Sequence, residues 1–232
     1  MKPEHVLIGC IAGVIWLLPL SVYLFTIARI TRRDHPTVVS GPWDFVGVIL
    51  GLSGFIVFGG GLVLALAQSN FRYSTRGNLE AFRDAWHREG TIWILISAAY
   101  LLLVVGIVAL TLFSRRRSLV IYNVDPTVFE GTITEVFEHM GRPIERRGNL
   151  WSSGTPLFEL DRFVGGHTVT LRWVSDDRRL FEEVERLLRE ALRDVESDEN
   201  VASRWLMACA GGLGFWAMCC IGLLFVYVFS SR

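Results

Sequence analysis

The chain has 232 residues, of which 51% are hydrophobic and 20% are charged, and its formal net charge is zero. Soluble globular domains average about 45–50% apolar and about 25% charged residues. The charged residues here are almost absent from four long segments and crowded into the rest of the chain. This distribution excludes one ordinary soluble domain and indicates an integral membrane protein.

Four apolar runs contain no Asp, Glu, Lys, Arg or His, and each is long enough to cross a bilayer. A hydrocarbon core of about 30 Å requires about 20 helical residues at a rise of 1.5 Å each. A helix also satisfies the backbone polar groups of a lipid-exposed segment within that segment. We therefore predict four membrane-spanning helices, at about residues 6–28, 45–67, 92–113 and 205–229.

The runs divide the chain into three predicted regions. Residues 1–113 hold three membrane helices and their loops, residues 114–203 form a soluble domain, and residues 204–232 hold the fourth helix and a short tail. Between the first two helices lies a short first loop, and between the second and third lies a second loop.

Arginines next to the helix ends predict the orientation, because basic residues near membrane helices are retained on the cytoplasmic side. With four spans, and leaving out residues 118–200, seven basic residues lie on the side of the soluble domain and six lie on the other side. Five of the seven form two clusters beside helix ends, which are Arg32 with Arg33, and Arg115 with Arg116 and Arg117. We therefore expect both termini outside the cell and the soluble domain in the cytoplasm.

The soluble segment is expected to fold as a small α+β domain with the element order β-α-β-β-β-α, an antiparallel sheet with two helices on one face. Asp125-Pro126 is a typical helix start, because Asp accepts hydrogen bonds from free amides and Pro suits the first helical position. Thr127 with Glu130 forms a competing capping box two residues later. The second helix carries an apolar stripe. The expected strands are 118–124, 144–151, 156–163 and 167–174, and the expected helices are 126–140 and 177–195.

The candidate interaction residues are arginines, which are expected to contact lipid, and glycines, which are expected to allow helix packing. We expect Arg115, Arg116, Arg117, Arg32 and Arg33 to contact the lipid interface, either by binding anionic head groups or as a topology signal and anchor. Small residues let membrane helices approach closely, which is expected at the positions Gly47, Gly51, Gly211 and Gly212. That packing can serve one helix bundle or a homo-oligomer.

Two further helix features follow from the same runs. Gly59-Gly60-Gly61 and Pro19 are expected to unwind or kink their helices. In the second loop, Leu79, Phe82 and Trp86 have helical spacing, with the aromatic residues Phe71 and Tyr73 nearby. This segment fits a helix that lies at the membrane interface or an ordinary packed loop helix.

Several function classes have little support in the sequence. Residues 118–200 contain 17 acidic residues and 10 arginines, whereas a nucleic-acid binder needs a basic surface. The histidines lack metal-ligand spacing, and no cofactor-binding motif is present. The only cluster that resembles an acid-base site is Arg33-Asp34-His35 in the first loop, where an ordinary surface loop is the expected interpretation.

Three functional hypotheses remain. The first is a non-enzymatic membrane protein whose soluble domain binds another protein as a scaffold or assembly subunit. The second is a transporter or channel component for a small neutral solute, since proton and ion pathways generally need ionisable groups inside the membrane. The third is a membrane-interface enzyme that uses Asp34, His35 and the arginines of the first loop.

Overall fold

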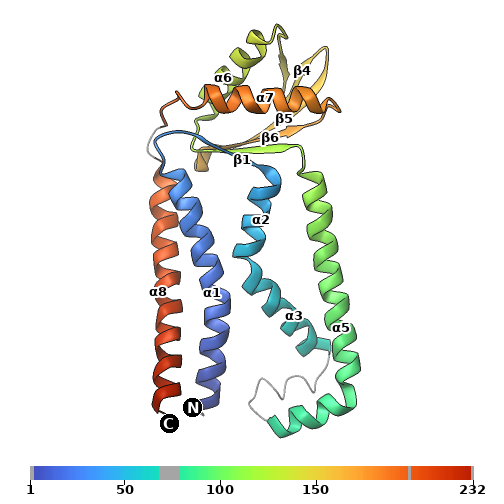
Figure 1. The fold of residues 1–232 in the computed structure, drawn as a ribbon, viewed down its shortest axis with the longest axis vertical. Helices are drawn as coiled ribbons and strands as arrows, with labels where there is room; N and C mark the ends of the chain where they lie inside the picture. The colour runs from blue at the N-terminus through green and yellow to red at the C-terminus, as the bar shows by residue number, and fades with distance from the viewer. Residues whose placement is uncertain (1–2, 68–78, 198–199, 231–232) are drawn as a thin grey trace. The chain divides into compact units, whose positions relative to one another are not determined.

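The computed structural model describes residues 3–67, 79–197 and 200–230 (Figure 1). The chain divides into two compact units. The helix unit consists of Met1–Tyr23, Ile49–Leu110 and Cys209–Arg232, and the sheet unit consists of Leu24–Val48 and Thr111–Ala208. The sheet unit thus contains all of the predicted soluble domain, residues 114–203, and also the first loop.

Long apolar helices dominate the described part of the chain. They are α1 (Pro3–Thr31), α2 (Gly41–Gly51), α3 (Ser53–Ala67), α5 (Leu79–Ser114) and α8 (Val201–Ser230). Within the described residues, α1, α5 and α8 are each long and apolar enough to cross a membrane. The helices α2 and α3 meet at an angle of 55°, and they make a fourth candidate span if the pair is counted as one. The composition of these helices is that of a membrane protein.

The break between α2 and α3 lies at Leu52 and not at the glycine triplet. α3 continues through Gly59–Gly61, and α1 continues through Pro19. At the break, the Ser53 hydroxyl donates a hydrogen bond of 2.8 Å to the carbonyl of Leu50. Glycines on both sides of the break, Gly51 and Gly54, lower the local helix propensity, so the chain bends where a serine side chain competes for a helix carbonyl.

Side-chain contacts fix the order of neighbours in the helix unit. The Ser21 hydroxyl of α1 donates to the carbonyl of Ala210 in α8 at 2.9 Å. Trp16 of α1 packs against the rings of Phe55 and Phe58 in α3. The Tyr100 hydroxyl of α5 donates to the carbonyl of Ile56 in α3 at 2.8 Å. The neighbours therefore run α8, α1, α3, α5 (Figure 1).

The start of α5 includes the second-loop segment that was expected to be helical. In Figure 1 this first part of α5 is turned away from the rest of the helix. Trp86 packs edge-on against Trp93 with ring centroids 5.8 Å apart. Phe71 and Tyr73 lie outside the described residues, so an interfacial position for this segment stays a prediction.

The sheet unit contains a fully antiparallel sheet, for which the described residues give the order β1-β2-β6-β5-β4-β3. Its strands are β1 (Thr37–Ser40), β2 (Ser118–Tyr122), β3 (Glu145–Arg147), β4 (Leu150–Ser153), β5 (Thr155–Phe163) and β6 (Thr168–Trp173). The sequence predicted four strands. The strand expected at 144–151 is instead a hairpin that turns at Gly148, whose φ of 67° favours glycine.

The additional edge strand, β1, comes from the first loop. It pairs with β2 over the register Thr37↔Tyr122 to Ser40↔Leu119. Val38 packs against the core of the sheet, and its carbonyl accepts a hydrogen bond of 2.8 Å from the Arg189 guanidinium. The first loop is therefore an integral part of this fold.

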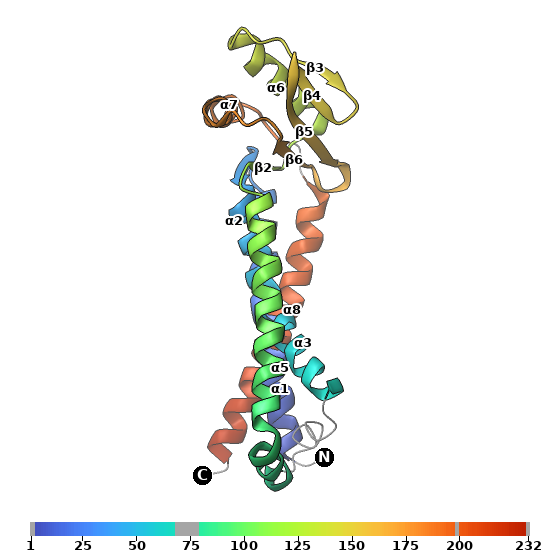
Figure 2. The ribbon, with the colours of Figure 1, turned by 90° about the vertical axis from the view of Figure 1, so that its right-hand side faces the viewer.

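Two helices, α6 (Pro126–His139) and α7 (Arg178–Ala191), cover one face of the sheet, as predicted (Figure 2). Phe129, Phe137 and Leu188 from the helices join Phe158 and Leu171 from the sheet in a buried core. Asp125 caps α6 by accepting from the amide of Thr127 at 2.7 Å. Hydrogen bonds from the Thr127 side chain and amide lower the pKa of the Asp125 carboxyl. Asp177 caps α7 by accepting from the amide of Leu180.

Candidate interaction site on the open face of the sheet

The second face of the sheet carries polar side chains where β5 and β6 run side by side. Successive residues of a strand point to opposite faces, and Leu160 and Leu171 are buried in the core. Glu159, Asp161 and Arg172 alternate with these leucines, so they point away from the core. Glu159 lies directly opposite Arg172 in the register, and Asp161 lies opposite Thr170.

These side chains line a polar cavity of about 700 Å³ within the sheet unit. The end of α5 provides another wall, with Thr111, Ser114 and Arg115. The remaining lining residues are Ser118, Asn149, Glu159, Leu160, Asp161, Thr170 and Arg172. Hydroxyl, amide, carboxylate and guanidinium groups therefore converge on one space, directly after the candidate span that ends at Ser114.

The charges in this cavity are of both signs and are accessible to a partner. Glu159, Asp161 and Arg172 are exposed, and none of them has an ion pair within the described residues. A partner group that carries both signs could pair with the carboxylates and the guanidinium at the same time. Such an arrangement favours recognition.

Arg115 is held at the cavity by a carboxylate from the first turn of α2. Asp44 is only 10% exposed, and its carboxylate lies 3.5 Å from the Arg115 guanidinium. The Tyr122 hydroxyl of β2 donates a hydrogen bond to the same carboxylate. The Arg115 guanidinium also lies 5.3 Å from the centre of the Phe45 ring. Asp44, at the end of the first loop, therefore connects this loop to Tyr122 of the sheet and to Arg115, which directly follows α5.

Close approach at this junction requires a glycine at the start of α2. A Cβ atom at Gly41 would lie 1.9 Å from the Ser118 hydroxyl oxygen and 3.0 Å from the carbonyl oxygen of Arg115. The Ser118 hydroxyl instead donates to that carbonyl at 2.9 Å. The start of α2 thus packs directly onto the backbone between α5 and β2.

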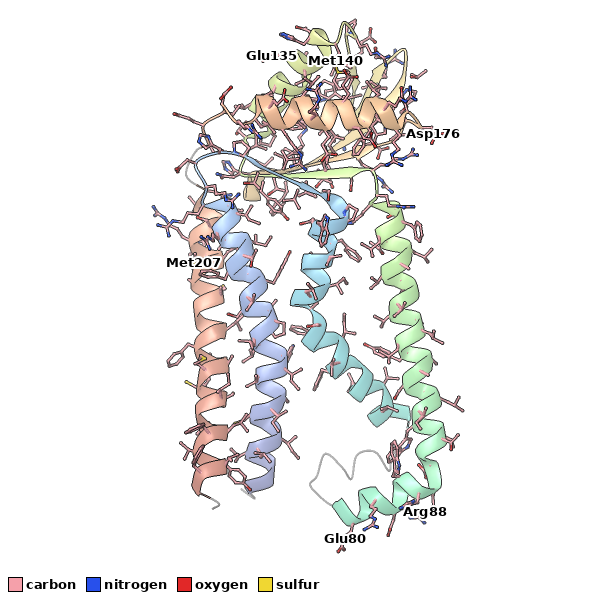
Figure 3. The ribbon with its side chains drawn as sticks, viewed as in Figure 1. Glu80, Arg88, Glu135, Met140, Asp176 and Met207 are labelled. Atoms are coloured by element: carbon pink, nitrogen blue, oxygen red, sulfur yellow. The ribbon has the colours of Figure 1, made fainter. Side chains whose placement is uncertain are left out.

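The predicted arginine triplet divides among three environments. Arg115 lines the cavity, and the Arg116 guanidinium lies 5.0 Å from the centre of the Phe113 ring. Arg117 donates to the carboxylate of Asp176 at 3.1 Å, and Figure 3 shows Asp176 just before the start of α7. Their contact with lipid head groups stays a prediction.

The first-loop residues Arg32, Arg33 and Asp34 line a small polar hollow of about 120 Å³ together with Asn123 and Ser197. Their backbone groups make the contacts: the Asn123 amide donates to the carbonyl of Arg33 at 2.6 Å, and the amide of Ser197 donates to the carbonyl of Asp34 at 2.9 Å. These bonds attach the first loop to the chain after α7.

Asp34 and His35, which were expected to belong to a surface loop and not to an acid-base site, lie in this tethered segment. The His35 Nδ1 atom lies at hydrogen-bond distance, 3.2 Å, from the carbonyl oxygen of Val195. The hydrogen bonds of the described residues include none between the His35 ring and the Asp34 carboxylate. The contacts of His35 and of the Asp34 carbonyl therefore attach the first loop to the chain after α7.

The predicted packing glycines occupy different surroundings. A Cβ atom at Gly51 would lie 2.6 Å from the Tyr23 side chain, so this position allows a close approach between α2 and α1. Gly47 is half-buried in α2. Cβ atoms at Gly211 and Gly212 would meet nothing within 4 Å in the described part of the chain. Packing at Gly211 and Gly212 against a second copy stays a prediction.

Sequence reasoning missed most residues of this site. Asp44 directly precedes the second apolar run, where a lone carboxylate is a detectable signal. Assigning the side chains of the expected strands to the two faces of the sheet would have grouped Glu159, Asp161 and Arg172.

In the described residues, no group of three or more His, Cys, Asp or Glu side chains could hold a metal ion. Comparisons with protein-family models, curated proteins and solved structures gave no match.

Proposed function

We propose that this chain is a four-span membrane protein whose sheet unit is a non-enzymatic interaction platform on the cytoplasmic side. The partner is a protein that presents charges of both signs to the cavity on the open face of the sheet. The observation that carries the proposal is the cavity, where Glu159, Asp161 and Arg172 lie beside the end of a candidate membrane span and form no ion pair with any residue that the structure describes.

The pairing of β1 with β2 supports four spans and not three. Paired strands must lie on the same side of a membrane, so the chain between Ser40 and Ser118 crosses it an even number of times. α5 provides one crossing, and the bent pair α2–α3 then provides the other. A re-entrant α2–α3 pair would put β1 and β2 on opposite sides.

The other two hypotheses receive less support from the geometry. The four apolar runs of the sequence contain no Asp, Glu, Lys, Arg or His, the groups that ion and proton pathways generally need. Asp34 and His35, the candidates for enzymatic chemistry, make backbone contacts that hold the first loop in place. The open cavity with accessible charges fits recognition better than either alternative.

Purification from native membranes, with gentle solubilisation, tests this function. We expect the wild-type chain to retain a stoichiometric protein partner, and Arg172→Glu to lose most of it, because the one cationic side chain left in the cavity lining, Arg115, is already paired with Asp44. The matched control is Arg179→Glu, since Arg179 is exposed on α7 and outside the cavity. A site-specific photo-crosslinker at Thr170 should attach to that same partner.

Two results would contradict the proposal. One is the absence of any stoichiometric partner from the wild-type preparation. The other is equal recovery of the partner with Arg172→Glu and Arg179→Glu, which would place the interaction elsewhere on the chain. An unchanged thermal unfolding midpoint for both variants shows that a lost partner reflects the cavity and not misfolding.

A further inference from the structure

Two apolar side chains project from the turn between β5 and β6. Phe163 and Val164 are each 68% exposed. Val164 begins a short 3-10 turn, Val164–Gly166, that leads into β6. Turns between strands usually carry Gly, Asn, Asp or Ser, and adjacent exposed apolar residues mark surfaces that something else covers.

Hydrogen bonds and a close ring contact support the conformation of the turn that leaves Phe163 and Val164 exposed. A Cβ atom at Gly166 would lie 2.4 Å from the Phe163 ring, which therefore packs over the Gly166 backbone. His167 has a φ of 47°, and its carbonyl accepts a hydrogen bond from the amide of Val124 at 2.9 Å. The Thr168 hydroxyl donates to the carbonyl of Gly166.

A buried side chain ties this turn to the beginning of α8. The Asn200 amide group donates to the carbonyl of Gly166 at 3.1 Å, and Asn200 is only 3% exposed. The Asn200 side-chain oxygen accepts from the amide of Ala202 in the first turn of α8. Figures 1 and 2 both show the β5–β6 turn beside the start of α8.

The start of α8 is itself the beginning of a candidate membrane span, Val201–Phe229. Its first turns expose Val201 and Trp205, and Trp205 is 72% exposed. Tryptophan is enriched where membrane helices leave the hydrocarbon. If α8 spans the membrane from Val201, the β5–β6 turn lies next to the point where this span begins.

We infer that Phe163 and Val164 insert into the boundary between lipid head groups and acyl chains, as a second membrane contact of the sheet unit. Lipid therefore covers the exposed side chains of Phe163 and Val164. Interfacial burial of apolar side chains is favourable in proportion to their area. The inference uses the proposed span of α8 and does not depend on the cavity beside Arg172.

Spin-label accessibility measures this insertion directly. Full-length protein, with its four cysteines replaced by serine or alanine, receives one cysteine at Val164, at Val128 or at Phe215. The protein is reconstituted in vesicles of phosphatidylcholine and phosphatidylglycerol. Val128 is the matched control, because it is an exposed valine on α6. Phe215, exposed in the middle of α8, reports the acyl-chain region.

We expect the label at Val164→Cys to collide severalfold less with a water-soluble nickel complex, and more with oxygen, than the label at Val128→Cys. Its depth should lie between those of Val128 and Phe215. Equal accessibility at 164 and 128, with a deep label at 215, overturns the inference and leaves the span intact. A water-accessible label at 215 overturns the span and the inference together.

A second measurement avoids the added cysteines. Lipids with a photoactivatable group near the top of the acyl chain should cross-link to the segment that contains Phe163 and Val164. The double variant Phe163→Ser with Val164→Ser should lose that cross-link and keep the one to Trp205. Cross-linking that is equal in the wild type and the double variant contradicts insertion.

Discussion

At the scale of single residues, Asp44 decides how the first loop joins the sheet. Its carboxylate is shared by the Tyr122 hydroxyl and the Arg115 guanidinium. The carboxylate is largely buried, whereas the side chain of Arg115 remains 43% exposed. The pair is therefore partly screened by water, and its loss costs less than the loss of a fully buried pair.

We predict that Asp44→Ala lowers the free energy of unfolding by roughly 1–3 kcal/mol, because two donors lose a charged acceptor. Tyr122→Phe should cost less, since it removes only one donor. The measurement is the thermal unfolding midpoint in lipid nanodiscs. Asp176→Ala is the control, because Asp176 pairs with Arg117 while fully exposed. Equal midpoints for Asp44→Ala and Asp176→Ala would show that the junction adds no stability.

At the scale of helices and strands, Gly54 allows α3 to approach α1. A Cβ atom at Gly54 would lie 2.4 Å from the carbonyl oxygen of Ile15 and 2.6 Å from the Cα of Trp16. Both neighbours are backbone atoms, which cannot move aside as a flexible side chain can. Gly61 lies in the same helix, and a Cβ atom there would meet no described atom within 4 Å.

These two glycines provide a matched test of helix packing. Leucine raises helix propensity equally at both positions. We therefore predict that Gly54→Leu reduces the yield of monodisperse protein and lowers the unfolding midpoint, whereas Gly61→Leu has little effect. Size-exclusion chromatography and thermal unfolding measure both quantities. If both variants behave like the wild type, α1 and α3 are not packed as described.

The sequence correctly predicts elements whose stabilising contacts lie between residues that are close together in the chain. Asp125-Pro126 correctly predicted the start of α6, since the cap and the helix are adjacent in sequence. β1 was missed because Thr37–Ser40 has only four residues and no clear alternation. It is a strand because it pairs with β2, which is distant in sequence. The candidate site could not be predicted fully for the same reason, because Glu159 and Arg172 are brought together by the pairing of β5 with β6.

At the scale of the whole molecule, strand pairing has a topological consequence that labelling can test. We predict that cysteines at Asp34 and Glu183 react with an impermeant maleimide from the same side of sealed vesicles, and that a cysteine at Glu80 reacts from the opposite side. All three side chains are exposed. Labelling of Asp34→Cys and Glu80→Cys from one side would contradict the crossing by α2 and α3.

The β1–β2 pairing also sets an order of events during synthesis. Val38 pairs with Ile121, so about 80 residues must be translated after β1 before its partner exists. At about 5–20 residues per second, β1 waits several seconds with its backbone groups unpaired. If α2, α3 and α5 cross the membrane as proposed, these helices are inserted during that interval. The pairing of β1 with β2 can then form only after both crossings have been made, so a complete sheet indicates correct insertion.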